Sequence, residues 1–80
     1  MEWRDVIESN PDILSGKPAV IGTRLSVEFV LSLFASGFSE ADVLANYPQL
    51  TPKTLRAVFA FGAECLRDEA TTLLLAANTR

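Results

Sequence analysis

Two glycines, a lysine and an arginine surround a short apolar run in the segment GKPAVIGTR, residues 16–24. Glycines beside cationic side chains are typical of loops that hold phosphate groups, such as the Walker loop G-x-x-x-x-G-K-[ST]. The match fails in three ways: the glycines stand at the wrong spacing, Lys17 follows the first glycine instead of the second, and the segment leads into an expected strand instead of a helix. These departures argue against a nucleotide-binding enzyme.

A structural loop is the better interpretation of the same segment. We expect Gly16 to close a turn, Pro18 to set the entry into a strand, and Gly22 to relieve a crowded backbone where that strand bends. Thr23 then places a hydroxyl at the rim of the loop. The residues assigned to this structural loop are Gly16, Lys17, Pro18, Gly22 and Thr23.

The residue types needed for metal or nucleophilic chemistry are almost absent. Cys65 is the only cysteine, and the chain has no histidine. A disulfide framework, a zinc finger and a Cys–His catalytic pair are therefore excluded within one chain. We expect Cys65 to be a core residue. The carboxylates are scattered along the sequence. The sequence therefore predicts a protein that is not an enzyme and that has no cofactor and no metal site.

Size and composition favour one small domain that associates with a second copy. The chain has 80 residues, which fits a single domain over residues 1–80, and 49% of its residues are apolar. Because so small a domain cannot bury that much apolar surface alone, we expect a homodimer. The charged N-terminus lacks the apolar core of a signal peptide, and the apolar run LLLAA is too short to cross a bilayer. We expect a cytoplasmic protein without membrane contact.

The charge is unevenly distributed. The net charge of −3 taken alone argues against nucleic acid. Yet the only charges over residues 43–63 are Lys53 and Arg56, and a second basic segment carries Lys17 and Arg24. Local positive surface governs non-specific DNA binding more than the total charge does. DNA therefore remains a possible ligand.

Capping residues and apolar spacing predict a mainly helical chain behind short N-terminal strands. We expect strands over residues 5–9 and 19–26, which form a hairpin-like start. Ser26 caps a helix that ends at Gly37, Ser39 caps a short second helix that Pro48 stops, and Thr51 caps a long third helix to about residue 77.

Several short motifs of this sequence resemble the DUF433 family of small bacterial domains. They are G-K-P at residues 16–18, G-T-R at residues 22–24, and Y-P-x-L-T at residues 47–51. The resemblance covers about residues 5–62 and leaves residues 63–80 as a C-terminal extension. It implies a homeodomain-like, three-helix helix-turn-helix bundle. It also implies the antitoxin half of a toxin–antitoxin pair, with a PIN-like ribonuclease as the toxin.

The second and third expected helices also have the order of a DNA-binding helix-turn-helix. A short capped helix is followed by the tight connection PQLT and then by a longer helix with polar residues at its start. In that motif the first turns of the last helix contact base edges in the major groove. The candidate DNA-binding residues are Thr51, Lys53, Thr54, Arg56 and Ala57.

The expected protein interface draws on both ends of the chain. Arg24 is either a solvated surface arginine or pairs with an acidic group, on this chain or on another subunit. The C-terminal segment has helical apolar spacing, so it binds either a toxin partner or the second subunit of the dimer. The candidate interface residues are Trp3, Val6, Ile7, Arg24, Leu66, Leu73 and Leu74.

Two function classes follow from these observations. The first is a DNA-binding antitoxin that represses its own operon by binding the operator and neutralises a ribonuclease. The second is a protein-interaction module whose helix-turn-helix is purely structural.

Overall fold

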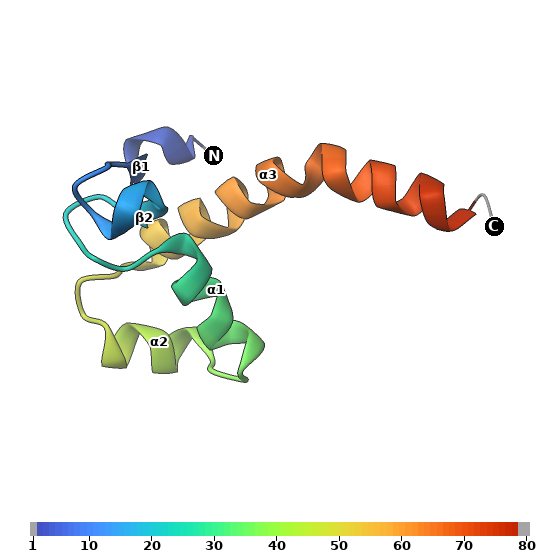
Figure 1. Ribbon diagram of the computed structural model, residues 1–80. Helices are drawn as coiled ribbons and strands as arrows, with labels where there is room; N and C mark the ends of the chain where they lie inside the picture. Colours follow the sequence, from blue (N-terminus) through green and yellow to red (C-terminus); the bar gives the residue numbers. More distant parts are fainter. Residues whose placement is uncertain (1, 79–80) are drawn as a thin grey trace.

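The protein consists of a small two-stranded sheet followed by three helices (Figure 1). The computed structural model describes the backbone of residues 2–78 and the side chains of residues 2–67. The elements in chain order are η1 (Trp3–Asp5), β1 (Ile7–Ser9), η2 (Leu14–Gly16), β2 (Pro18–Val20), α1 (Val27–Ala35), α2 (Glu40–Asn46) and α3 (Pro52–Asn78), where η marks a short 3-10 helix. The expectation of a mainly helical chain with N-terminal strands is thus confirmed.

The sheet is shorter than the sequence suggested. Strands β1 and β2 pair antiparallel, with Ile7 opposite Val20 and Ser9 opposite Pro18. The expected second strand, residues 19–26, is wrong beyond Val20, because the chain turns there. Ser26 returns beside Ala19 in one isolated bridge, so this stretch closes on itself instead of extending the sheet.

A threonine side chain holds that turn. The Thr23 hydroxyl donates to the carbonyl of Val20 at 2.8 Å and accepts from the backbone N–H of Leu25 at 3.0 Å. Gly22 lies in the left-handed region, with φ 81°. Hydroxyl-to-backbone bonds of this kind compete with the hydrogen bonds of a sheet, which explains why the strand stops.

The helix ends follow the capping residues of the sequence. Ser26 accepts the N–H of Phe29 at the start of α1, and Ser39 and Asp42 form a reciprocal capping box at the start of α2. At the end of α1, Gly37 has φ 99° and its N–H bonds back to the helix, the pattern of a Schellman motif. These predicted boundaries are confirmed.

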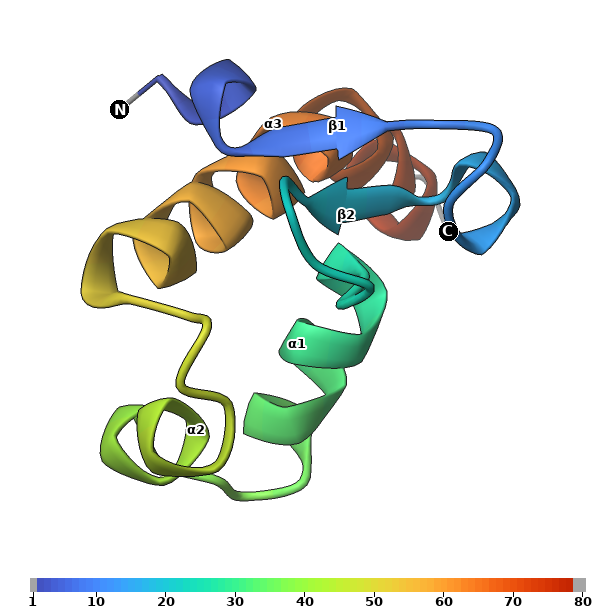
Figure 2. The ribbon, with the colours of Figure 1, turned by 90° about the vertical axis from the view of Figure 1, so that its left-hand side faces the viewer.

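One apolar core joins the sheet, α1, α2 and the first half of α3. Figure 2 shows the sheet lying against α3 and α2 lying at the opposite end of α1. No polar or charged residue is buried in the described part of the chain. The largest fully buried side chains are Val30, Val43, Leu55 and Val58.

The second half of α3 leaves this core. The helix of 27 residues is about 40 Å long at 1.5 Å per residue, and its C-terminal end projects away from the other elements (Figure 1). The chain measures 46 × 30 × 23 Å along its principal axes. None of the helices in the described residues has the length and apolar character required to span a membrane.

Candidate DNA and partner interfaces along the third helix

The first turn of α3 is built on two threonines. The backbone N–H of Thr54 donates to the Thr51 hydroxyl at 3.2 Å, and the backbone N–H of Thr51 donates to the Thr54 hydroxyl at 2.7 Å. Both side chains therefore cap the helix, in the manner of a capping box. Pro52 occupies the first helical position, where its missing N–H leaves no donor unpaired.

Lys53 and Arg56 are the two exposed cations of the predicted DNA-binding set. They stand three residues apart, and no ion pair joins either of them to another residue whose side chain is described. Ala57 is fully buried in the core, at 0% exposure, so a ligand on the surface of α3 cannot reach its side chain. The set therefore divides into two exposed cations, two capping threonines and one core residue.

In the loop of residues 16–24, a glycine is favoured at position 22 by the backbone angle φ and not by crowding. A Cβ added to Gly22 meets nothing within 4 Å, so the expectation of a crowded backbone is wrong. The left-handed φ alone favours glycine there. The Thr23 hydroxyl is half-buried and binds backbone atoms of the turn. Lys17 and Arg24 are exposed, and Pro18 begins β2.

The N-terminal 3-10 helix is fastened to the middle of α3. The indole N–H of Trp3 donates to Glu64 at 2.5 Å, and the Arg4 guanidinium contacts the same carboxylate at 3.2 Å. The Trp3 ring also meets the Phe61 ring edge-on, with centroids 4.6 Å apart, and Arg4 lies over the indole. The indole hydrogen bond and the nearby guanidinium hold the pKa of Glu64 below its usual value. Sequence patterns could not reveal this contact, because its partners lie 61 residues apart.

The remaining interface candidates differ in their exposure. Val6 and Ile7 are buried in the chain's own core, at 8% and 4% exposure, and leave little surface for a partner. Trp3 is partly covered by α3. Leu66 is 57% exposed, whereas the side chains of Leu73 and Leu74 lie outside the described residues.

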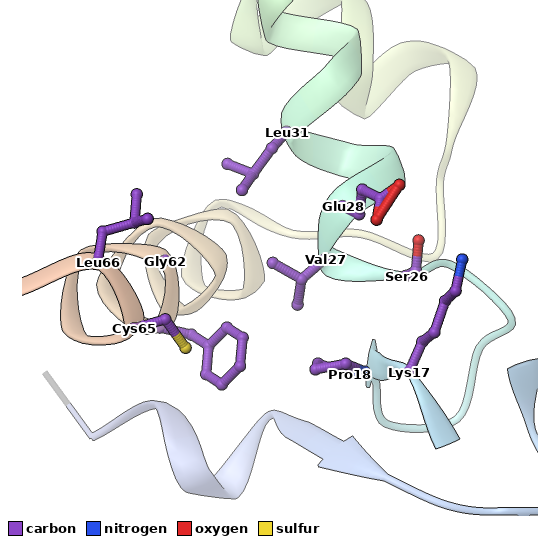
Figure 3. A pocket seen from close by; sticks show the side chains of 10 residues that line it. Lys17, Pro18, Ser26, Val27, Glu28, Leu31, Gly62, Cys65 and Leu66 are labelled. Carbon is purple, nitrogen blue, oxygen red and sulfur yellow. The ribbon is translucent and has the colours of Figure 1, made fainter. Parts of the chain in front are cut away.

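An apolar pocket opens where α3 leaves the body. Its volume is about 470 Å³, and Figure 3 shows it between α1, the start of β2 and the middle of α3. Cys65 lines it and is exposed, so the expectation of a core cysteine is wrong: α3 has already passed the core at this point. The lining residues are Lys17, Pro18, Ser26, Val27, Glu28, Leu31, Phe61, Gly62, Cys65 and Leu66. Among the described residues, no group of three His, Cys, Asp or Glu side chains could hold a metal ion.

Known proteins resemble this chain in sequence and in fold. The family model described as "Protein of unknown function (DUF433)" matches residues 7–62. The uncharacterized protein y4eO of Sinorhizobium fredii is 40% identical over 53 residues, which are 66% of this chain. The chain spans about a quarter of that relative, since the match covers 24% of its length. The crystal structure of a DUF433 member protein from Anabaena variabilis has a TM-score of 0.72 at 24% identity, over 90% of this chain and 70% of that one.

Proposed function

This chain belongs to the DUF433 family, and we propose that it is an antitoxin-like DNA-binding protein that acts as a homodimer in the cytoplasm. In this proposal α2 and α3 form a helix-turn-helix of the homeodomain-like kind, and α3 contacts the major groove of operator DNA. The protein then represses its own operon and neutralises a PIN-like ribonuclease toxin. It is a binding protein and not an enzyme.

The exposed pair Lys53 and Arg56 carries the DNA-binding part of the proposal. Both cations lie at the start of α3 and neither is engaged by a carboxylate of the described side chains. A cation without an acidic partner can neutralise a DNA phosphate without first breaking an ion pair. Arginine can also bind a guanine edge with two hydrogen bonds. A homodimer doubles this otherwise small basic surface.

A gel-shift titration with the DNA upstream of the protein's own gene tests this function. The double variant Lys53→Ala/Arg56→Ala should lose most of its affinity, and the slope of log K against log salt should fall by about 2, roughly one per lost phosphate contact. The variant Lys17→Ala/Arg24→Ala is a matched control, because it removes two exposed cations outside α3. Equal losses in both variants, or no binding by the parent protein, would refute DNA recognition by α3.

The protein-interaction module without DNA binding is the alternative. Two observations favour it: the hydroxyls of Thr51 and Thr54 are already used within the helix cap, and Ala57 is buried. A net charge of −3 also weakens attraction to DNA. A protein that binds no upstream DNA, yet forms a stable complex with the product of the neighbouring gene, would support this alternative.

A further inference from the structure

A stripe of apolar and small residues follows one face of α3 from the body into the projecting half, and the two large ones whose side chains are described are exposed. Phe59 is 46% exposed and Leu66 is 57% exposed, although both are large apolar side chains. Apolar or small residues recur from Phe59 onward at steps of three and four, which places their positions on one face of an α-helix. The stripe positions are Phe59, Gly62, Ala63, Leu66, Ala70, Leu73, Leu74 and Ala77.

The positions of this stripe are symmetric about Asp68, and each large residue on one side of Asp68 corresponds to a small residue on the other side. If a second copy of α3 runs antiparallel and is related by a two-fold axis at Asp68, positions equally far from Asp68 lie at the same level. Each level then combines one large residue with one small residue. The resulting levels pair Phe59 with Ala77, Gly62 with Leu74, Ala63 with Leu73, and Leu66 with Ala70.

We propose that this stripe is a homodimer interface in which two α3 helices pack antiparallel about Asp68. Alternation of large and small residues across facing positions is what fills the space between two helices evenly. A stripe that binds an unrelated partner has no reason to complement itself at every level. The contact extends over roughly 30 Å of helix, from the Phe59 level to the Ala77 level at each end.

The pocket at the base of the projecting half adjoins the Gly62 and Ala63 levels. Gly62 and Leu66 belong both to the stripe and to the pocket wall, together with Leu31 of α1 (Figure 3). In the pair, the positions of Leu73 and Leu74 from the second copy come level with Ala63 and Gly62, next to this opening. A Cβ at Gly62 would stand 3.6 Å from the Leu31 side chain, an ordinary van der Waals contact, so Leu31 borders this level from one side.

The same pairing agrees with the proposed function, on which this last step rests. Arg56 and Lys53 lie at about 60° and 120° from Phe59 around the helix, on the same flank of the stripe. The two-fold axis of an antiparallel pair passes between the helices and is perpendicular to both. It therefore brings Lys53 and Arg56 of both copies to the same face of the dimer. The two Arg56 positions are then about 36 Å apart along the helices, close to the one-turn spacing of DNA half-sites, about 34–36 Å.

A size-swap experiment tests the pairing in the full chain. Sedimentation equilibrium should show a dimer for the parent protein. Leu66→Ala should weaken dimerisation about a hundredfold, because each dimer loses two buried leucines and each is worth tenfold or more. Ala70→Leu alone should overpack the same level. The double variant Leu66→Ala/Ala70→Leu restores one large and one small residue per level and should regain most of the affinity.

Spin labels then fix the orientation of the helices. A label on Asn78→Cys in a Cys65→Ser background should give an inter-label separation of about 30 Å or more, because the antiparallel pair carries these ends apart. A label on the native Cys65 should give the shorter distance. A monomeric parent protein, a double variant no better than Leu66→Ala, or close Asn78 labels would each overturn the pairing. A monomer that still binds operator DNA would refute the pairing alone, and a dimer that passes both tests without binding DNA would refute DNA binding alone.

Discussion

The first half of α3 buries Leu55, Ala57 and Val58 in the core, whereas the second half carries the exposed Leu66 and runs beyond every other element (Figure 1). Both halves belong to one continuous helix with apolar residues at helical spacing. Apolar spacing therefore shows which face of a helix is apolar, but it does not show what packs against that face. In the first half, the chain's own sheet and helices pack against α3. In the second half, the proposed dimer places a second copy of α3 against it.

The largest effect should separate a core leucine from a stripe leucine. Leu55→Ala should lower the free energy of unfolding by about 3 kcal/mol, because Leu55 is 1% exposed and its loss leaves a cavity. Leu66→Ala should lower it by no more than about 0.5 kcal/mol in dilute protein, where the chain is monomeric. Urea denaturation at submicromolar concentration measures both. A similar loss in the two variants would mean that the projecting half is already part of the monomer's core.

Removing the contact of Trp3 with α3 should have the next largest effect on stability. Trp3→Ala should lower the free energy of unfolding by about 2 kcal/mol, because the edge-on contact with Phe61 and the buried area of the indole are lost. Hydrogen exchange should show reduced protection around residues 61–64, with residues 52–58 little changed. Trp3→Phe keeps a ring and removes the N–H, so it should retain most of the stability. If protection instead falls evenly along α3, the fastening does not mark the boundary between the two halves.

Substitution by alanine should change the stability in opposite directions at two glycines. Gly22→Ala should destabilise the body by about 1 kcal/mol, since its φ of 81° disfavours any side chain. Gly62→Ala should stabilise α3 by about 0.5 kcal/mol in the monomer, because the new Cβ makes an ordinary contact with Leu31 and alanine favours helix. Thermal melts followed by circular dichroism compare them. A destabilising Gly62→Ala would show that α1 and α3 need the closer approach of a glycine.

The smallest effect should appear in acid. The pKa of Glu64 is lowered in the folded protein, so the folded state favours the ionised carboxylate. Its contribution to stability is complete above pH 4.5, the ordinary value for glutamate, and is lost as the pH falls through the lower folded value. Glu64→Gln should therefore lessen the loss of stability between pH 5 and pH 3. Urea midpoints across that range measure it, with Glu40→Gln as the control, and an unchanged slope would contradict a structural role for this carboxylate.

Sequence reasoning succeeded where the deciding groups are close in the chain. The caps at Ser26, Ser39 and Thr51 bond to backbone three residues on, so each helix start could be predicted. The strand to Ser26 was wrong because the Thr23 hydroxyl takes the backbone bonds that a strand needs.

The candidate sites were harder to predict from the sequence because they depend on tertiary packing. Ala57 was assigned to DNA because it lies near the start of its helix, but the core covers that side of α3. Cys65 was assigned to the core by residue type, yet α3 leaves the body there. The contact of Trp3 with Glu64 joins residues from opposite ends of the chain, and nothing in local spacing encodes it.

The fastening of Trp3 to α3 also gives the protein a built-in optical probe. Trp3 is the only tryptophan of the chain, and its indole touches both an aromatic ring and a carboxylate at the point where α3 leaves the body. Its emission therefore reports on one place, the junction between the covered and uncovered halves of the helix. A binding event that bends or shields the projecting half should shift that emission without any added dye, whereas a ligand confined to the first turn of α3 should leave it unchanged.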